Sequence, residues 1–236
     1  MNEHLPLIEV RSVYKTYDKG LVPALHGISL SLERGKIYAL MGPSGCGKST
    51  LLNIIGTLDN PDKGEILYEG RTLKLLYPIE KFRQKFIGFI FQFHHLIPVL
   101  TLCENVEAAL LTQKEVSSKQ RRELSTTILE EMGLKMKIDS YASQISGGQR
   151  QRGAIARALI NSPKVVLADE PTGNVDSKTA KLILQKFRDH IEKTRGTILM
   201  ATHDHNVAAM ADVIIEMQDG EIVSIVDNKL LDQGDL

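Results

Sequence analysis

Apolar and polar residues follow two different periods along this chain, and each period predicts a different kind of element. Residues 8–13 and 28–32 alternate apolar with polar side chains, as strands with one buried face do. Residues 36–41 are a mostly apolar run that ends at Gly42, which is typical of a strand buried on both faces. We therefore expect an antiparallel lobe at the start, followed by a strand of a parallel sheet.

The middle of the chain changes to the helical period. Four apolar residues recur at helical spacing between Ser117 and Gly133: Leu124, Ile128, Leu129 and Met132. Ser117 and Gln120 have the spacing of a capping box, and Gly133 is a residue type that commonly ends a helix. This stretch predicts a helical lobe.

Later segments return to strand patterns. Residues 165–168 and 197–201 predict two buried strands, each followed by polar residues at the carboxyl end, where α/β sheets bind ligands. Residues 213–223 hold two apolar stretches around Asp219 and Gly220, a strong hairpin signal. Together these patterns indicate an α/β fold with a mainly parallel sheet, an antiparallel β lobe and an α-helical lobe.

Composition narrows the classes of function. The 236 residues are 42% apolar and 25% charged, as in an ordinary globular protein. Lys plus Arg and Asp plus Glu are equal at 29 each, so the chain lacks the basic field that binds nucleic acid, and we expect no nucleic-acid partner. No apolar run reaches the length of about 18 residues that a membrane-spanning helix needs. Residues 1–6 do not resemble a signal peptide, so we expect a cytoplasmic chain.

The two cysteines, Cys46 and Cys103, are too few for a disulfide framework and lack the spacing of a metal site. We expect both to be reduced thiols. The segment from Asp227 to Leu236 is a polar tail without a recognisable function.

A glycine-rich loop follows the strand at residues 36–41. It matches the phosphate-binding pattern GxxxxGK[ST] with Gly42, Pro43, Ser44, Gly45, Cys46, Gly47, Lys48 and Ser49. Residues 50–55, beginning with Thr50, can form the helix that this pattern requires. The glycines allow backbone N–H groups to surround phosphate oxygens, Lys48 adds a positive charge, and Ser49 can ligate Mg²⁺. The alternative is a glycine-rich turn that binds nothing.

Two acidic residues end the strand at residues 165–168. Asp169 and Glu170 would be costly to ionise beside an apolar strand unless they faced a metal or a substrate. We therefore expect Asp169 to contact Mg²⁺, directly or from the next layer of ligands, and Glu170 to orient or deprotonate an attacking water. A strand that simply reaches solvent is the alternative.

A phosphate loop alone would suit a kinase, a GTPase or a recombinase, and a second motif distinguishes among these classes. Residues 145–149 read Ile-Ser-Gly-Gly-Gln and resemble the LSGGQ signature of ABC ATPases, with Ile in the first place. Four of them can open a helix whose positive end faces a phosphate, a second anion site on one chain: Ser146, Gly147, Gly148 and Gln149. The resemblance implies a head-to-tail dimer, in which the signature of one subunit covers ATP on the phosphate loop of the other.

Other segments resemble further ABC motifs in the same order. Tyr17 resembles the aromatic residue that stacks on adenine, although an exposed tyrosine at a strand end is the alternative. Gln92 resembles the glutamine that contacts Mg²⁺ or water and links the site to the membrane partner. His203 resembles the switch histidine that contacts the γ-phosphate. Residues 171–176 resemble the D-loop, with Asp176 reaching across the dimer, although they contain Gly-Asn-Val-Asp where Ser-Ala-Leu-Asp is commoner.

The resemblance extends from about residue 8 to residue 223. It implies a single ABC ATPase domain over residues 1–236, with the core and antiparallel β lobe at about 1–92 and 162–228 and the helical lobe at about 93–161. Three histidines without a ligand set are expected to be surface or packing residues: His94, His95 and His205.

The resemblance also implies a mechanism. Two chains bind MgATP, and their dimer closes and drives a separate integral membrane permease, which holds the ATPase on the inner face of the cell membrane. Glu170 activates water, Lys48 and the signature amides stabilise negative charge with Mg²⁺, and His203 holds the γ-phosphate in register. Residues 96–101 and 173–174 resemble the corresponding segments of the ABC ATPases that serve lipoprotein release and macrolide export. The transported substrate is not expected to touch this chain.

Residues 92–105 are the candidate contact surface for the permease because this region holds more apolar groups than a loop needs: Phe91, Phe93, Leu96, Ile97 and Leu100. The alternative is that these side chains pack within the helical lobe. Two other functions stay open: a mechanotransmission ATPase that controls an extracytoplasmic protein without moving a substrate, and a non-transport ABC ATPase that acts on DNA or ribosomes. The second is disfavoured because such proteins resemble tandem ATPase domains or carry long coiled coils.

Overall fold

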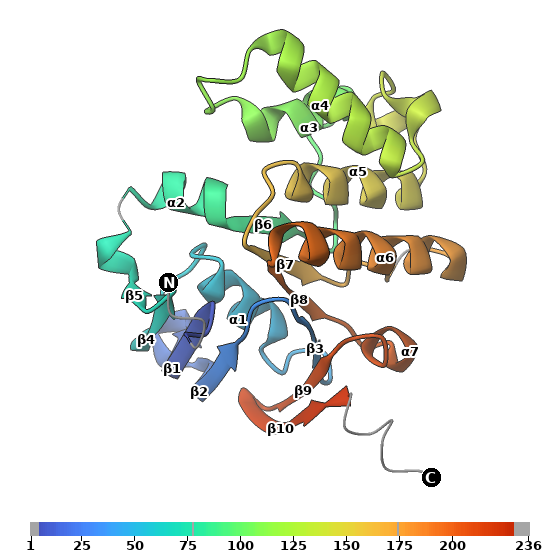
Figure 1. Ribbon diagram of the computed structural model, residues 1–236. Coiled ribbons are helices and arrows are strands. Elements are labelled where there is room, and N and C mark those ends of the chain that lie inside the picture. Colours follow the sequence, from blue (N-terminus) through green and yellow to red (C-terminus); the bar gives the residue numbers. More distant parts are fainter. Residues whose placement is uncertain (1–4, 77, 174, 229–236) are drawn as a thin grey trace.

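The computed structural model describes residues 5–76, 78–173 and 175–228, and its strands form two sheets (Figure 1). Residues 1–4, Asn174 of the predicted D-loop and residues 229–236 of the predicted tail lie outside the described residues.

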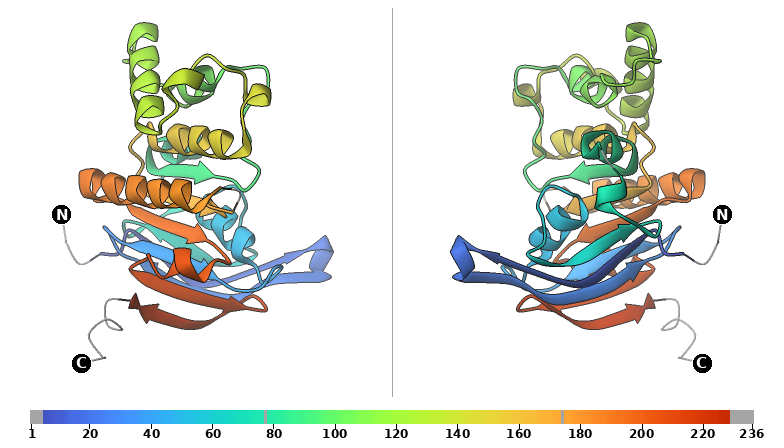
Figure 2. Two further views of the ribbon diagram at one scale, coloured as in Figure 1. Left: turned by 90° about the vertical axis from the view of Figure 1, so that its right-hand side faces the viewer. Right: turned by 90° about the vertical axis from the view of Figure 1, so that its left-hand side faces the viewer.

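The first sheet is antiparallel and has the order β2-β1-β4-β5. Its strands are β1 (Ile8–Tyr17), β2 (Val22–Leu32), β4 (Lys63–Tyr68) and β5 (Arg71–Thr72). β1 pairs antiparallel with both β2 and β4, so the predicted antiparallel lobe is confirmed. The hairpin of β1 and β2 extends beyond the rest of the fold in both views of Figure 2.

The second sheet has the order β10-β9-β3-β8-β7-β6. Its strands are β3 (Ile37–Met41), β6 (Ile87–Ile90), β7 (Val165–Asp169), β8 (Thr197–Ala201), β9 (Val213–Gln218) and β10 (Glu221–Asp227). Only the pairing of β10 with β9 is antiparallel among these strands. The mainly parallel sheet and the final hairpin are therefore confirmed.

Helices lie on both faces of the second sheet. They are α1 (Lys48–Ile55), α2 (Ile79–Phe86), α3 (Leu102–Glu107), α4 (Ser118–Glu131), α5 (Gly147–Leu159), α6 (Ser177–Thr194) and α7 (His205–Ala208). Short 3-10 turns occupy Asp18–Gly20, Leu73–Leu75, Ala108–Leu110, Lys135–Lys137 and Ala142–Gln144. Figure 1 places α3 and α4 farthest from the antiparallel sheet, with α5 beneath them, so the helical lobe is a separate layer.

The predicted capping box of α4 is present. The hydroxyl of Ser117 accepts from the backbone N–H of Gln120, and the side chain of Gln120 accepts from the backbone N–H of Ser117. Both bonds satisfy amides that the first turn of a helix leaves without a partner. No described helix combines the length and the apolar character that crossing a bilayer requires.

Two apolar clusters enclose the second sheet. Tyr38 and Leu40 of β3 face the cluster that includes α1 and the antiparallel sheet, whereas Ile37, Ala39 and Met41 face the cluster that includes α5 and α6. All five of these residues are buried. Burial of each large apolar side chain contributes roughly 1.5–3 kcal/mol, so the central strands hold a rigid edge from which the functional loops extend.

Candidate nucleotide-binding and catalytic site

The phosphate-type loop connects β3 to α1. Its last residue, Gly47, is the N-cap of α1 and has φ of +103°, a left-handed conformation that favours glycine. A Cβ at this position would lie 2.5 Å from the backbone oxygen of Ala24. Glycine therefore allows the chain to turn tightly here, and the positive end of α1 opens onto the loop.

Lys48 lies at the start of α1 and its ammonium group turns back over the loop. Its Nζ donates to the backbone oxygen of Gly42 at 2.6 Å and to that of Pro43 at 2.9 Å. These bonds place a positive charge beside the backbone amides of the loop. Such an arrangement binds the phosphates of a nucleotide.

Ser49 and Asp169 meet although 120 residues separate them. The Ser49 hydroxyl donates to Oδ2 of Asp169 at 2.7 Å, because β7, which ends at Asp169, is separated from β3 only by β8. A hydroxyl and a carboxylate are oxygen ligands of the type that Mg²⁺ prefers, and Mg²⁺ is usually held by one or two such groups together with phosphates. The pair fits that ion. No group of three or more His, Cys, Asp or Glu forms a metal site within the described part of the chain.

Glu170 follows Asp169 and contacts His203, which comes two residues after β8. Nδ1 of His203 lies 2.8 Å from Oε1 of Glu170, and the side chains are 75% and 13% exposed, respectively. The hydrogen bond to Glu170 and the charge of that carboxylate raise the pKa of His203. The other oxygen of Glu170, Oε2, is buried and has no hydrogen-bond partner among the described residues.

A single cavity of about 330 Å³ connects the phosphate loop with Asp169 and Glu170, whereas His203 is not among the residues that line it. It is lined by residues from both sheets and from the loops between them, among them Tyr17, Lys48, Ser49, Gln92, Asp169 and Glu170. Val22, Pro23 and Ala24 of β2 supply an apolar wall next to Tyr17. A larger cavity of about 610 Å³, beside Ile66 and Tyr68, contains none of the predicted catalytic residues, so chemistry and not size identifies the site.

The signature residues lie elsewhere on the molecule. Ser146 is the N-cap of α5, where its hydroxyl accepts from the backbone N–H of Gln149 and the Gln149 side chain accepts from the backbone N–H of Ser146. None of the residues from Ser146 to Gln149 lines the cavity around the phosphate loop. The described chain therefore keeps the phosphate loop and the signature helix as two separate features.

Comparison with known proteins decides the family. Residues 25–173 match the family described as ABC transporter. The chain belongs to this family. A relative named uncharacterized ABC transporter ATP-binding protein MJ1508, from Methanocaldococcus jannaschii, is 46% identical, and the match covers 93% of this chain and 99% of that protein. The match with this relative therefore spans nearly all of both proteins.

Two relatives carry functional names. The lipoprotein-releasing system ATP-binding protein LolD of Anaeromyxobacter dehalogenans is 42% identical, with 93% of each chain covered. The macrolide export ATP-binding/permease protein MacB of Syntrophobacter fumaroxidans is 44% identical over 92% of this chain but only 31% of that protein. The predicted resemblance to the lipoprotein-release and macrolide-export branch is confirmed.

Solved structures support the fold and the activity. A dimeric post-hydrolysis state of the ATP-binding cassette MJ0796 bound to ADP and Pi is 40% identical, covers 94% of this chain and 98% of its own, and has a TM-score of 0.87. The chain is thus an ABC ATPase, which binds and hydrolyses ATP.

Asp176, predicted to reach across the dimer, caps its own helix in this ABC ATPase. Its carboxylate accepts from the backbone N–H and from the hydroxyl of Thr179, both at 2.9 Å. The hydrogen bond from the Thr179 backbone is the largest cause of the lowered pKa of Asp176.

Some residues around the site were not predicted. Asp59 contacts the hydroxyl of Tyr17, and Arg157 holds the segment that follows Gln92. Asp59 lies in an Asp-Asn-Pro turn signal, but no local pattern joins it to a residue 42 positions earlier. Of the three histidines expected at the surface or in packing, His94 is buried, whereas His95 and His205 are exposed.

Proposed function

We propose that this ATPase works as one of two copies in a head-to-tail dimer and couples MgATP binding and hydrolysis to a separate membrane permease. The observation that supports the proposal best is the single cavity that joins Tyr17, the phosphate loop, Asp169 and Glu170 while the signature helix lies apart from it. A second copy brings its own signature helix to the open side of this cavity.

Each part of the cavity suits one part of the nucleotide. Tyr17 and the apolar wall of β2 take the adenine, while the phosphate loop and the first turn of α1, from Gly42 to Thr50, take the phosphates. Ser49, Asp169 and Gln92 hold Mg²⁺, which neutralises phosphate charge when it is bound. Lys48 adds its own positive charge to the same phosphates.

Glu170 is the general base in this proposal. Its buried Oε2 has no donor among the described residues, and leaving such an acceptor without a partner costs about 1–3 kcal/mol. Glu170 also lines the nucleotide cavity, so a water molecule held there beside its carboxylate is positioned to lose its proton. His203 fixes the other oxygen of Glu170, and its exposed ring can also reach the γ-phosphate.

The second copy supplies the amides that the phosphate loop lacks on its open side. Ser146, Gly147, Gly148 and Gln149 begin α5, so their end of the helix carries partial positive charge. The related MJ0796 cassette is dimeric in its ADP- and Pi-bound state. Asp176 reaches the partner in the same interface, since it lies at the exposed start of α6.

The permease contact lies after Gln92. Phe93, Ile97 and Val99 are exposed, Phe93 by 75% and Val99 by 78%, whereas Leu96 packs partly against the apolar cluster of the helical lobe. A cavity of about 420 Å³, lined by Phe89, Phe91 and His95 among others, adjoins the same segment. The exposed side chains favour a docking role over internal packing alone.

The names of the relatives suggest the type of transport. We infer export or release of a lipophilic, peptide or lipoprotein-like substrate, with the ATPase held on the inner face of the cell membrane by its permease and out of contact with the substrate. A mechanotransmission role uses the same dimer and the same permease contact. The number of spans and the size of the extracytoplasmic domain of the co-purifying permease separate the two.

Two variants test the catalytic part. Glu170→Gln retains ATP binding, accumulates an ATP-bound dimer and loses about 10²- to 10⁴-fold in turnover, the usual scale for a general base. Lys48→Ala weakens ATP binding itself. Light scattering reports the dimer, phosphate release reports turnover, and titration with fluorescent ATP reports affinity.

The same measurements can refute the assignment. Wild-type turnover in Glu170→Gln removes Glu170 from the role of base. Unchanged ATP affinity in Lys48→Ala counts against the phosphate loop, and an ATP-loaded Glu170→Gln protein that stays monomeric at high concentration counts against the dimer.

A further inference from the structure

A network of side chains connects the end of β1 to the segment after α1. The hydroxyl of Tyr17 lies 2.9 Å from Oδ2 of Asp59. Oδ1 of the same carboxylate accepts from Nζ of Lys15 at 2.8 Å and from the backbone N–H of Asn60 at 2.7 Å. The ammonium group of Lys15 also lies over the Tyr17 ring, 5.1 Å from its centre.

The charges in this network settle the direction of the hydrogen bonds. Burial by itself would raise the pKa of Asp59, but the hydrogen bonds from Lys15 and Tyr17 lower it below its ordinary value. The hydrogen bond to Asp59 raises the pKa of Lys15. An ionised carboxylate only accepts, so the Tyr17 hydroxyl is the donor. A hydrogen bond to a charged acceptor is roughly twice as strong as a neutral one.

The network restricts the Tyr17 ring from two sides. The hydroxyl is held at its tip, and Lys15 covers one face, so a base can stack only on the opposite face. Tyr17 lines the nucleotide cavity together with the apolar wall of β2, whereas neither Asp59 nor Lys15 is among the residues that line it. Asp59 therefore acts on a ligand in this cavity through Tyr17 and not by direct contact.

We propose that Asp59, supported by Lys15, is a positioning residue that holds Tyr17 in the orientation in which it stacks on the adenine base. This rests on the proposed contact of Tyr17 with the base. A ring that is already ordered loses less conformational entropy when the nucleotide binds, so affinity for a base-bearing ligand rises. Affinity for a phosphate ligand without a base does not depend on the ring.

The test compares ADP with inorganic pyrophosphate, each with Mg²⁺. Neither ligand is turned over, and only ADP carries a base. Calorimetric titration gives the dissociation constant for ADP, and competition against ADP gives that for pyrophosphate. Asp59→Ala is expected to weaken ADP binding by about 2- to 10-fold, the cost of ordering one side chain, and to leave pyrophosphate binding unchanged.

Tyr17→Phe tests the same contact from the other side, since it keeps the ring and removes only the hydroxyl. It is expected to weaken ADP binding in the same direction, and the double variant is expected to lose less than the sum of the two single variants, because both changes remove the hydrogen bond between Tyr17 and Asp59. Asp59→Asn keeps a carbonyl acceptor and should lose less than Asp59→Ala. Because Tyr17→Phe barely changes volume, it remains informative even if Asp59→Ala folds poorly.

Asp62 is a matched control in the same segment. Its Oδ2 accepts from the backbone N–H and the hydroxyl of Thr16, and its Oδ1 lies 3.8 Å from Nζ of Lys15. Asp62→Ala removes a carboxylate beside the network but leaves the hydrogen bond from Tyr17 to Asp59 in place. The ratio of ADP to pyrophosphate affinity is expected to stay at the wild-type value.

The outcomes separate this proposal from the one on which it rests. Tyr17→Ala removes the ring, so an unchanged ADP affinity in that variant refutes the base contact, and the positioning role with it. A loss in Tyr17→Ala without a loss in Asp59→Ala or Tyr17→Phe overturns the positioning role alone. Equal weakening of both ligands by Asp59→Ala means a general structural effect and also overturns it.

Discussion

Glu170 has a backbone conformation that few residues of its type adopt. Its φ is +49°, in the left-handed region, where a residue other than glycine typically carries a cost of about 1–3 kcal/mol. The backbone N–H of Glu170 donates to the oxygen of Ala201 at 3.0 Å, and the Glu170 oxygen accepts from the backbone N–H of Gly173 at 3.2 Å, so backbone hydrogen bonds hold this residue on both sides. The result is a carboxylate that turns away from the strand direction toward His203 and the phosphate loop.

The pair of Glu170 and His203 predicts a pH dependence. Because the hydrogen bond and charge of Glu170 raise the pKa of His203 in the folded protein, the stabilisation from the pair is complete below the ordinary value of 6.5. It is lost as the pH rises through the raised pKa. In Glu170→Gln the pKa of His203, followed by NMR of the ring protons without nucleotide, is expected to fall toward the ordinary value.

Asp204 provides the control for that titration, because its charge raises the pKa of His203 less than Glu170 does. Asp204→Asn is expected to shift the titration of His203 by less than Glu170→Gln. An identical pKa of His203 in the wild type and in Glu170→Gln would show that the two side chains do not pair in solution.

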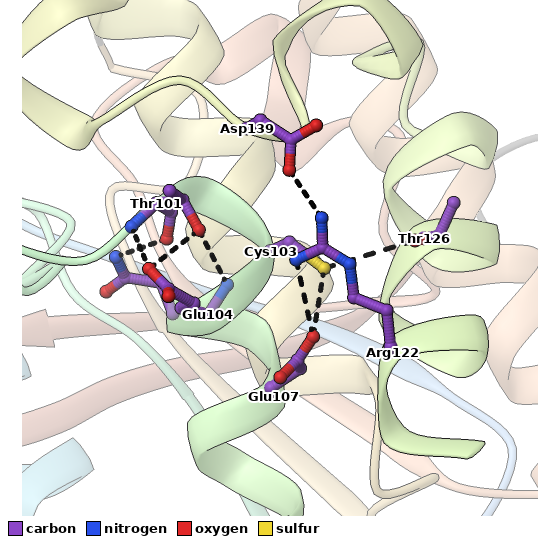
Figure 3. A network of polar contacts seen from close by, with 8 residues as sticks. Thr101, Cys103, Glu104, Glu107, Arg122, Thr126 and Asp139 are labelled. Atoms are coloured by element: carbon purple, nitrogen blue, oxygen red, sulfur yellow. Dashed lines mark hydrogen bonds and ion pairs between the residues drawn. The ribbon is translucent and has the colours of Figure 1, made fainter. Parts of the chain in front are cut away.

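The surroundings of Cys103 predict how reactive its thiol is. Figure 3 shows its sulfur between α3 and α4, next to Glu107 and Arg122. Burial and, to a lesser degree, the hydrogen bond to Glu107 raise the pKa of the thiol to about 11. Since the thiolate is the reactive form, Cys103 in the folded protein is expected to resist iodoacetamide at pH 8, as measured by peptide mass spectrometry.

Unfolding is the control for this experiment, because it exposes the thiol and returns its pKa to the usual range. In guanidinium chloride Cys103 should be alkylated at the rate of a free cysteine. Alkylation of the folded protein at that same rate would contradict the burial of the thiol.

At the scale of elements, α5 contacts two parts of the site. Its amino end carries the signature, and near its other end Arg157 donates to the backbone oxygens of His95 at 2.6 Å and His94 at 2.9 Å. Both histidines have a positive φ, and burial lowers the pKa of Arg157. One helix therefore holds the segment that follows Gln92 and also presents the signature.

Arg157→Met is expected to leave two backbone carbonyls without their donor and to destabilise the protein by about 1–3 kcal/mol. Because the segment after Gln92 loses its support, turnover should also fall while ADP affinity stays close to wild type. Urea unfolding gives the first quantity and steady-state phosphate release the second. Arg157→Lys replaces the forked guanidinium with a single ammonium donor, so its stability and turnover should lie between those of the wild type and those of Arg157→Met.

Arg152 is the matched control on the same helix. Its guanidinium donates to the backbone oxygen of Met132 in the helical lobe and to that of Gly148 one turn earlier in α5, and among the described residues no hydrogen bond joins it to the segment after Gln92. Arg152→Met is expected to lower stability without the loss of turnover seen in Arg157→Met. If both variants lose turnover in proportion to stability, Arg157 has no particular effect on Gln92.

Local patterns predict some elements of this fold and not others. β3, β7 and β8 are buried apolar runs, and α4 has both its apolar period and its capping box, so each could be predicted from the sequence. The sequence of α6 also carries a helical pattern, because the N-cap Asp176 is followed by apolar residues at helical spacing that are buried: Ile183, Leu184, Phe187 and Ile191. β6 has only four residues, too few for a period to separate strand from helix.

The contacts within the site also differ in how well the sequence predicts them. Ser49 and Asp169 could be expected to meet, because the carboxyl ends of parallel strands share one edge of a sheet. The contact of Tyr17 with Asp59 could not, since it depends on where a turn after α1 lies beside the end of β1. Residues that position other residues leave little local signal, because their partners are set by the tertiary fold.

At the scale of the whole molecule, the cavity and the signature helix are complementary but separate. A head-to-tail pair of copies would join each cavity to the signature of the other, so that ATP lies at an interface. Only a ligand that binds the closed dimer more tightly than the open one can shift that equilibrium. The γ-phosphate meets this condition, because both copies contact it in the proposed dimer and hydrolysis removes it.

In the proposed complex, closure of the dimer reaches the permease through the exposed segment after Gln92. Phe93→Asp and Val99→Asp each place a charge on an exposed apolar side chain, so they should leave folding and nucleotide binding close to wild type. They should abolish co-purification with the permease, because burying an unpaired charge at an interface is costly. Pull-down from detergent extracts, together with the ATPase rate of the complex, measures the loss.

Met136→Asp is the control, since Met136 is 87% exposed in the helical lobe, outside this segment. If all three variants lose the permease alike, any added acidic charge is enough and the segment has no special role. If Phe93→Asp and Val99→Asp both keep the permease, these side chains do not form the contact. Loss in both, with retention in Met136→Asp, places the permease beside Gln92, where dimer closure at the nucleotide can move it.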